Sequence, residues 1–178
     1  VRTRWTVSRR TGSKPTFWTM SLGAALVALV GYGLFGFQAP MMQRLHGMSP
    51  GTFALQYGVP LSLISAVGTF AGGYLAEKLT PRSVAAVAWL PAVGLGLAIP
   101  LYIVGFYMEP GTMQIAVWGL GAAAHYSYLG AQYTIGQGVV SQRSRASAIA
   151  ILLFIIALIG NGLGPQFVGI LSDMFMKM

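Results

Sequence analysis

The sequence predicts an all-α integral membrane protein with five transmembrane helices. Hydrophobic residues make up 55% of its 178 residues and charged residues only 8%, whereas about a quarter of the residues in a soluble domain are charged. The hydrophobic residues gather in five long runs, which short polar or turn-forming stretches separate. A helix needs about 20 mostly apolar residues to cross the hydrocarbon core of a bilayer, so each run is long enough to span it.

The five predicted spans follow one another with short connections between them. They cover residues 16–42, 51–76, 83–107, 113–140 and 147–172. The connections are centred on residues 43–47, 77–82, 108–112 and 141–145. Because such connections leave little room for a crossover, we expect consecutive spans to run antiparallel as neighbours.

Lysine and arginine predict the orientation of the spans, because both residues are enriched in cytoplasmic loops. With the N-terminus inside, two of the 11 basic residues are external, Arg44 and Lys177. The others are internal: Arg2, Arg4, Arg9, Arg10, Lys14, Lys78, Arg82, Arg143 and Arg145. We therefore expect a multi-pass protein of the cell membrane, with residues 1–15 as a basic cytoplasmic linker and 16–178 as a transmembrane bundle. The net charge of +8 then reports topology, and no nucleic-acid partner is expected.

The residue types in the sequence also limit which kinds of site the protein can form. The absence of cysteine rules out disulfides and thiolate metal sites. No Ser/His/Asp spacing, metal-ligand cluster or phosphate-binding loop is present in the sequence. We therefore expect neither an enzyme nor a bound cofactor or metal.

The fourth predicted span is the most polar of the five. At 3.6 residues per turn, His125, Tyr128 and Gln132 share one face, and Tyr133 lies on the adjacent stripe. Polar groups that face lipid without a partner are costly, so at least one stripe should face protein or water. Its central position favours the wall of a substrate cavity over an aromatic belt, and interhelical hydrogen bonding remains the alternative.

The ionisable character of His125 and three residues outside this face extend the prediction. His125 is the only ionisable group well inside a span, so proton coupling and simple hydrogen bonding are both open. No Asp or Glu lies in a span core. Gln38 and Tyr57 are cavity candidates near the outer mouth, and Asn161 is a candidate on the fifth span. Each of these three could equally be a packing hydrogen bond.

A family resemblance enters at the turn after the second span, which reads GGYLAEKLTPR over residues 72–82. This stretch resembles the G-x-L-a-D-r-x-g-R loop signature of the major facilitator superfamily. Glu77 stands in place of the usual aspartate, and Pro81 disturbs the glycine–arginine portion. The family carries the signature between helices two and three and, in weaker form, between helices eight and nine. The second copy fits this chain.

The fifth span carries the other half of the match. It reads LIGNGLGPQFVGILSD over residues 158–173, and it resembles the eleventh helix of the Spinster-like branch of the superfamily. The resemblance implies that the five spans are helices seven to eleven of a 12-helix fold. The first six helices and the twelfth would then be absent from this chain.

The glycines and the proline of the fifth span affect how this helix packs and bends in lipid. Gly160, Gly164 and Gly169 let helix backbones approach closely, where packing replaces the hydrophobic effect. Pro165 frees the carbonyl of Asn161 and favours a kink. Static packing and packing combined with gating both remain open.

The family also implies a cytoplasmic latch, in which the loop acid meets an adjacent helix start and local arginines in one conformation. Its members here would be Gly73, Glu77, Lys78, Arg82, Arg143 and Arg145. The alternative is a solvated charged turn that only sets topology.

Together these features predict transport of a small organic or lipid-like amphiphilic solute by alternating access. The chain would act as the C-terminal part of a major facilitator secondary transporter. Its partners would be the solute, membrane lipid, the missing N-terminal six-helix half and the final helix, so the chain alone is not expected to transport. The alternative function is a non-transporting membrane subunit that packs on a larger complex.

Overall fold

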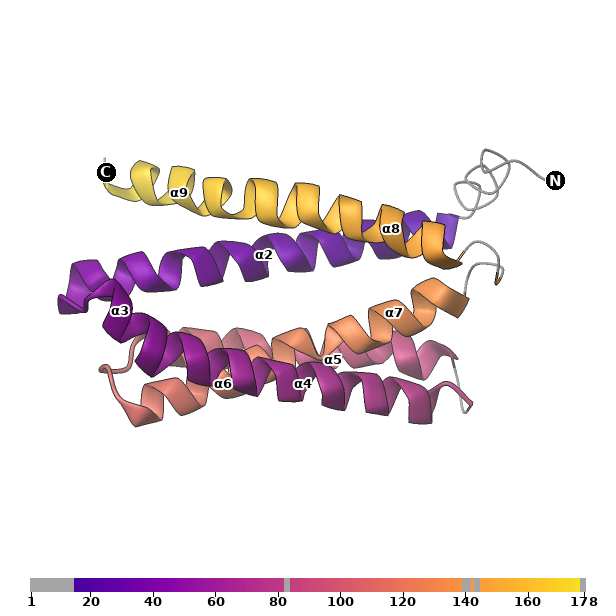
Figure 1. Cartoon of the computed structure of the whole chain (residues 1–178), viewed down its shortest axis with the longest axis horizontal. Coiled ribbons are helices and arrows are strands. Elements are labelled where there is room, and N and C mark those ends of the chain that lie inside the picture. Colours follow the sequence, from indigo (N-terminus) through magenta and orange to yellow (C-terminus); the bar gives the residue numbers. More distant parts are fainter. Residues whose placement is uncertain (1–14, 82–83, 139–141, 143–144, 177–178) are drawn as a thin grey trace. The chain divides into compact units, whose positions relative to one another are not determined.

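A computed structural model describes residues 15–81, 84–138, 142 and 145–176, and every regular element in these ranges is helical (Figure 1). In chain order the elements are α2 (Pro15–His46), α3 (Pro50–Phe53), the π-helical turn η1 (Ala54–Gly58), α4 (Val59–Leu79), α5 (Val84–Phe106), α6 (Thr112–Tyr126), α7 (Tyr128–Gly138), α8 (Arg145–Ile156), the π-helical turn η3 (Ala157–Asn161) and α9 (Gly162–Met176). The described residues of all five predicted spans are almost entirely helical, which confirms the predicted fold class.

Four helical stretches of the described residues are long and apolar enough to cross a membrane. They are Phe17–His46, Pro50–Leu79, Trp89–Phe106 and Arg145–Met174. The predicted span 113–140 differs from the prediction, because a turn at Ser127 divides it into α6 and α7. Neither half reaches spanning length by itself.

The connection between the first two spans is encoded locally. Gly47 ends α2 with a φ of 62°, a left-handed conformation that suits glycine. Its N–H donates to the carbonyl of Gln43 at 3.1 Å. Ser49 then caps α3 by accepting a hydrogen bond from the N–H of Thr52, and Pro50 occupies the first turn of that helix.

The chain forms two compact units, of which the first holds α2 up to Met41 together with α8, η3 and α9. In this unit α2 and the α8–α9 stretch lie side by side and run parallel. The residue numbers of the facing pairs rise along both helices: Ala28 faces Gly160, Gly33 faces Gly164, and Phe37 faces Gly169. Their apolar core consists of Phe17, Ala24, Ala28, Ala148, Leu152 and Ile156. Small residues at the crossing allow the two helices to pack closely.

The second unit holds residues 42–135, with α6 packed against both α4 and α5. The facing residues show that α4 runs parallel to α6 and α7, whereas α5 runs antiparallel to them. These residues are Gly68 with Ala123 and Gly72 with Ser127 for α4, and Gly94 with Ser127 and Gly105 with Trp118 for α5. The second span thus packs mainly on the fourth and less on the third, its neighbour in sequence.

Candidate substrate-binding site

The polar face of the fourth span is buried. His125, Tyr128 and Gln132 are 3%, 5% and 4% exposed. The His125 ring makes edge contacts with Tyr102 of α5, at 6.2 Å between centroids, and with Tyr126 and Tyr128 at 5.1 and 5.8 Å. The His125 part of the predicted face is therefore packed among aromatic rings inside the second unit.

Two side chains on this face keep unsatisfied polar atoms. Neither the Nε2 nor the Oε1 atom of Gln132 has a hydrogen-bond partner among the described residues, and neither does Nε2 of His125. Nearly all buried polar groups in proteins are hydrogen-bonded, and leaving one unsatisfied costs about 1–3 kcal/mol. The face therefore offers donor and acceptor capacity to a group that these residues do not supply.

The turn at Ser127 interrupts the span in the middle of this polar face. The Ser127 hydroxyl donates to the carbonyl of Ala124 at 2.7 Å, and its N–H donates to the carbonyl of Ala123 at 3.1 Å. From α4, the hydroxyl of Thr69 reaches the carbonyl of Tyr126 at 3.5 Å. Hydrogen bonds from neighbouring groups are the means by which membrane helices tolerate such interruptions.

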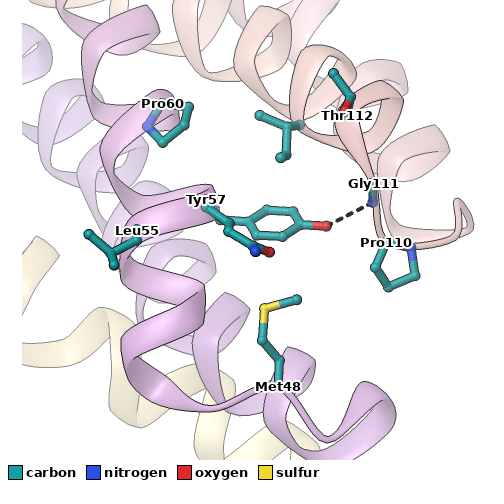
Figure 2. A pocket seen from close by; sticks show the side chains of 9 residues that line it. Met48, Leu55, Tyr57, Pro60, Pro110, Gly111 and Thr112 are labelled. Carbon is teal, nitrogen blue, oxygen red and sulfur yellow. Dashed lines mark hydrogen bonds between the residues drawn. The ribbon is translucent and has the colours of Figure 1, made fainter.

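A second polar constellation lies at the predicted outer end of the same unit. Tyr57 is 1% exposed, and its hydroxyl donates to Oε1 of Gln114 at 2.8 Å. The hydroxyl oxygen of Tyr57 also accepts a hydrogen bond from the N–H of Gly111 at 3.1 Å, as Figure 2 shows. Nε2 of Gln114 in turn donates to the carbonyls of Gly105 and Met108 at 3.0 and 3.1 Å. The network joins η1 to the loop before α6, so Tyr57 is fully engaged.

Beside this network lies a pocket of about 450 Å³ (Figure 2). Its lining residues are Met48, Leu55, Gln56, Tyr57, Pro60, Pro110, Gly111, Thr112 and Ile115. The polar face at His125, Tyr128 and Gln132 contributes none of them. The structure thus separates two groups of candidate residues within one unit.

The remaining cavity candidates are less clustered. Gln38 is 4% exposed and Asn161 is exposed, and both belong to the first unit. Tyr133 is partly buried on α7, next to Gln132.

Sequence reasoning missed Gln114, whose signal was a lone amide in the first turn of an apolar span. The turn at Ser127 was missed as well, since no signal for it was visible in the sequence.

The loop signature lies at the end of α4. Gly73 approaches Gly130 of α7, since a Cβ on Gly73 would lie 3.8 Å from the Cα of Gly130. Glu77 and Lys78 are exposed, and the Lys78 ammonium lies 4.5 Å from the centroid of the Tyr74 ring. The other latch candidates are Arg145, which is exposed at the start of α8, and Arg82 and Arg143, which lie outside the described residues.

The glycines of the fifth span lie at the helix crossing of the first unit. A Cβ on Gly160 would lie 2.7 Å from that of Ala28, and one on Gly164 would lie 2.6 Å from the carbonyl oxygen of Leu29. Gly169 is looser, at 3.7 Å from the Phe37 ring. The π-helical turn η3 ends at Asn161, four residues before Pro165. π-turns are a known way for a helix to bend.

Two known membrane transporters are similar to this chain. A bacterial homologue of the human lysosomal transporter Spinster, solved in an inward-facing and unoccupied conformation, is 54% identical and superposes with a TM-score of 0.90 over 98% of this chain. An MFS-type efflux pump of Mycolicibacterium smegmatis is 31% identical over 160 residues, or 90% of this chain. The chain belongs to the major facilitator superfamily. The resemblance to its Spinster-like branch is confirmed.

The superfamily assignment settles several expectations. Both relatives are transporters by name, so the expectation of a non-enzyme is confirmed and a non-transporting subunit is not favoured. A multi-pass membrane protein of the major facilitator superfamily also agrees with the long apolar helices. The chain spans 37% of the efflux pump and 36% of the Spinster homologue. No family model matches the chain.

Proposed function

We propose that the chain forms helices seven to eleven, in the C-terminal part of a Spinster-like secondary transporter. The transporter would move a small organic or lipid-like amphiphilic solute across the membrane by alternating access. In this mechanism two bodies rock around a site near the middle of the bilayer. The similarity to a Spinster homologue over nearly the whole chain supports the class of function, and the buried polar face supports the site.

The site proposal rests on the amide of Gln132, which has no hydrogen-bond partner among the residues that the structure describes. Gln132 lies seven residues after His125, which is close to two helical turns, and both side chains are buried on either side of the turn at Ser127. Gln132 offers both a donor and an acceptor, and His125 offers a ring nitrogen. We expect these atoms to meet a polar group of the solute, with Tyr128 and Tyr133 beside them. Gln38, Tyr57 and Asn161 would contribute in other parts of the transport path.

Replacement of two glutamines on the fourth span tests this proposal. Gln132→Leu removes an unpartnered buried amide, so it should abolish saturable uptake while thermal stability stays equal or rises. Gln114→Leu is the matched control. It breaks three hydrogen bonds and should lower stability by about 1–3 kcal/mol.

The measurement is uptake of candidate amphiphiles into liposomes, beside thermal unfolding, for the chain expressed with whatever further spans its gene encodes. Normal uptake by Gln132→Leu would contradict a role in solute binding. The chain of 178 residues alone should insert without transporting, because it supplies one of the two bodies that alternating access requires.

The proposed transporter resides in the cell membrane with residues 1–15 in the cytoplasm. The distribution of lysine and arginine supports this orientation. The cytoplasmic latch is part of the same proposal: Glu77 would meet the neighbouring helix start and the arginines at 82, 143 and 145 in one conformation of the transport cycle. In the predicted orientation Glu77 is the one acid of this sequence on the cytoplasmic side, so the substitution of Glu77 is a direct test of the latch.

The distribution of charge supports the proposed solute class. All three acids, Glu77, Glu109 and Asp173, lie at the ends of the predicted spans. The polar face therefore provides neutral hydrogen-bonding groups and aromatic rings. Such a face suits the uncharged polar and apolar parts of an amphiphile. If the solute or a proton requires a carboxylate, the remainder of the transporter provides it.

A further inference from the structure

Helix α4 has two opposite faces of different chemistry. One face is buried in the second unit and carries Leu61 and the small residues Gly68, Gly72 and Ala76. The other face lies half a turn away and is exposed. Its central line consists of Leu63, Val67, Phe70 and Tyr74, whose exposures run from 51% to 77%, followed by Lys78.

This difference indicates what covers the exposed face. Helices that pack on one another in a membrane do so through small residues, as α4 does with α6 at Gly68 and Gly72. The central line of the exposed face contains only large side chains, which suit contact with lipid tails. A tyrosine followed one turn later by a lysine is typical of the level of the lipid headgroups.

Tyr74 and Lys78 already contact each other. The Lys78 ammonium lies 4.5 Å from the centroid of the Tyr74 ring, so the aromatic ring holds the cation at the end of the apolar line. A lysine ammonium has three donors, and a tyrosine hydroxyl can donate one more. The pair therefore offers a positive charge and hydrogen-bond donors directly beyond a stripe that fits acyl chains.

We propose that Leu63, Val67 and Phe70 face the lipid tails and that Tyr74 and Lys78 bind the phosphate headgroup of an anionic phospholipid. The neighbouring carboxylate, Glu77, is also exposed and opposes an anion. Replacement of Glu77 by a neutral residue should therefore strengthen the binding of the anionic headgroup. This inference concerns a lipid partner and does not depend on which solute the proposed transporter moves.

Lipid retention tests the headgroup site. The protein, expressed with any flanking spans of its gene, is reconstituted in nanodiscs of phosphatidylcholine with or without phosphatidylglycerol. Phospholipid that remains bound after extraction is then counted by native mass spectrometry. Lys78→Ala should reduce retained phosphatidylglycerol about fivefold, since one lysine near an anionic surface contributes roughly 1 kcal/mol. Glu77→Gln should increase it, and retained phosphatidylcholine should not change.

Arg44→Ala is the control, because it removes an exposed cation at the far end of another helix. An equal loss of phosphatidylglycerol in Arg44→Ala and Lys78→Ala would overturn the site in favour of unspecific charge attraction.

A photoreactive side chain provides a second, independent test of the exposed face. At position 70, where Phe70 is 77% exposed, it should couple to lipid. At position 61, where Leu61 is 4% exposed on the same helix, it should couple to protein. Coupling of the probe at position 70 to another helix of the protein, or to a second copy, would overturn the lipid-facing assignment.

Discussion

The α-carbon of Gly72 lies directly against the backbone of Ser127, so that a methyl group at position 72 would collide with the serine carbonyl. From the other side, a Cβ on Gly94 would lie 2.5 Å from the serine hydroxyl oxygen. The turn that divides the fourth span is therefore held between two glycines, one from α4 and one from α5. Gly72, the glycine directly before the signature glycine Gly73, thus has a packing partner in the polar span.

Exchange of Gly72 should show how tight this clamp is. Gly72→Ala places a methyl group on backbone atoms that cannot rotate away, and we expect a loss of about 1–3 kcal/mol in the free energy of unfolding. Thermal unfolding of the purified protein measures it. Gly96→Ala on α5 is the control, because no atom lies within 4 Å of its added Cβ. Similar melting temperatures for the two variants would refute the clamp.

The hydroxyl of Tyr57 should stabilise the outer end of the second unit. Tyr57→Phe leaves both Oε1 of Gln114 and the N–H of Gly111 without their partner. We expect a loss of about 1–3 kcal/mol, as for other buried groups left unsatisfied. Tyr107→Phe removes a hydroxyl from a side chain that is 89% exposed and should have little effect. Hydrogen exchange in the loop 107–111 would localise the change.

The crossing at Gly164 distinguishes static packing from gating. Gly164→Leu adds bulk where a Cβ would already lie 2.6 Å from a carbonyl oxygen of α2. A gating role predicts assembled protein that is trapped in one conformation, which site-directed accessibility labelling detects. Uniform loss of folded protein would support static packing. Gly162→Ala is the mild control, since its nearest neighbour would be 3.9 Å away.

Neutralisation of Glu77 tests the cytoplasmic latch. Glu77→Gln should impair transport by the complete transporter while insertion and expression stay normal, because only the charge that would meet the arginines is removed. Uptake into liposomes and the amount of protein in the membrane are measured together. Full uptake at normal expression would reduce Glu77 to a residue that sets topology.

The orientation is tested with single cysteines, which the absence of native cysteine makes unambiguous. Cysteines at positions 14, 82 and 145 should be protected from a membrane-impermeant maleimide in intact cells. A cysteine at position 109 should be labelled. Labelling of positions 82 and 109 from the same side would refute the five-span topology.

Composition and periodicity were sufficient for the fold class. Long apolar runs with few charges can only be spanning helices, because the bilayer leaves no other way to satisfy the backbone. The local signals at Gly47, Ser49 and Pro50 also account for the turn between the first two spans. The shared face of His125, Tyr128 and Gln132 followed from helical spacing, and the structure shows all three side chains buried.

Composition, periodicity and turn residues did not predict which helices pack against each other. The sequence favoured consecutive neighbours, yet α4 packs mainly on α6, and α2 packs on the fifth span. Every predicted span carries glycines, and their spacing indicates close packing without indicating the partner. Only the structure assigns Gly72 and Gly94 to the same serine.

The amino-acid sequence by itself determined which segments are helical and which residues share a helix face, because both depend on the properties of one segment and its solvent. The tertiary structure decided which helices meet, where the fourth span turns, and which glutamine is partnered. Gln114 is engaged by three groups, whereas Gln132 is engaged by none of the described residues. Two chemically identical side chains on one span differ in this way because hydrogen bonding depends on atoms far apart in sequence, brought together only by packing.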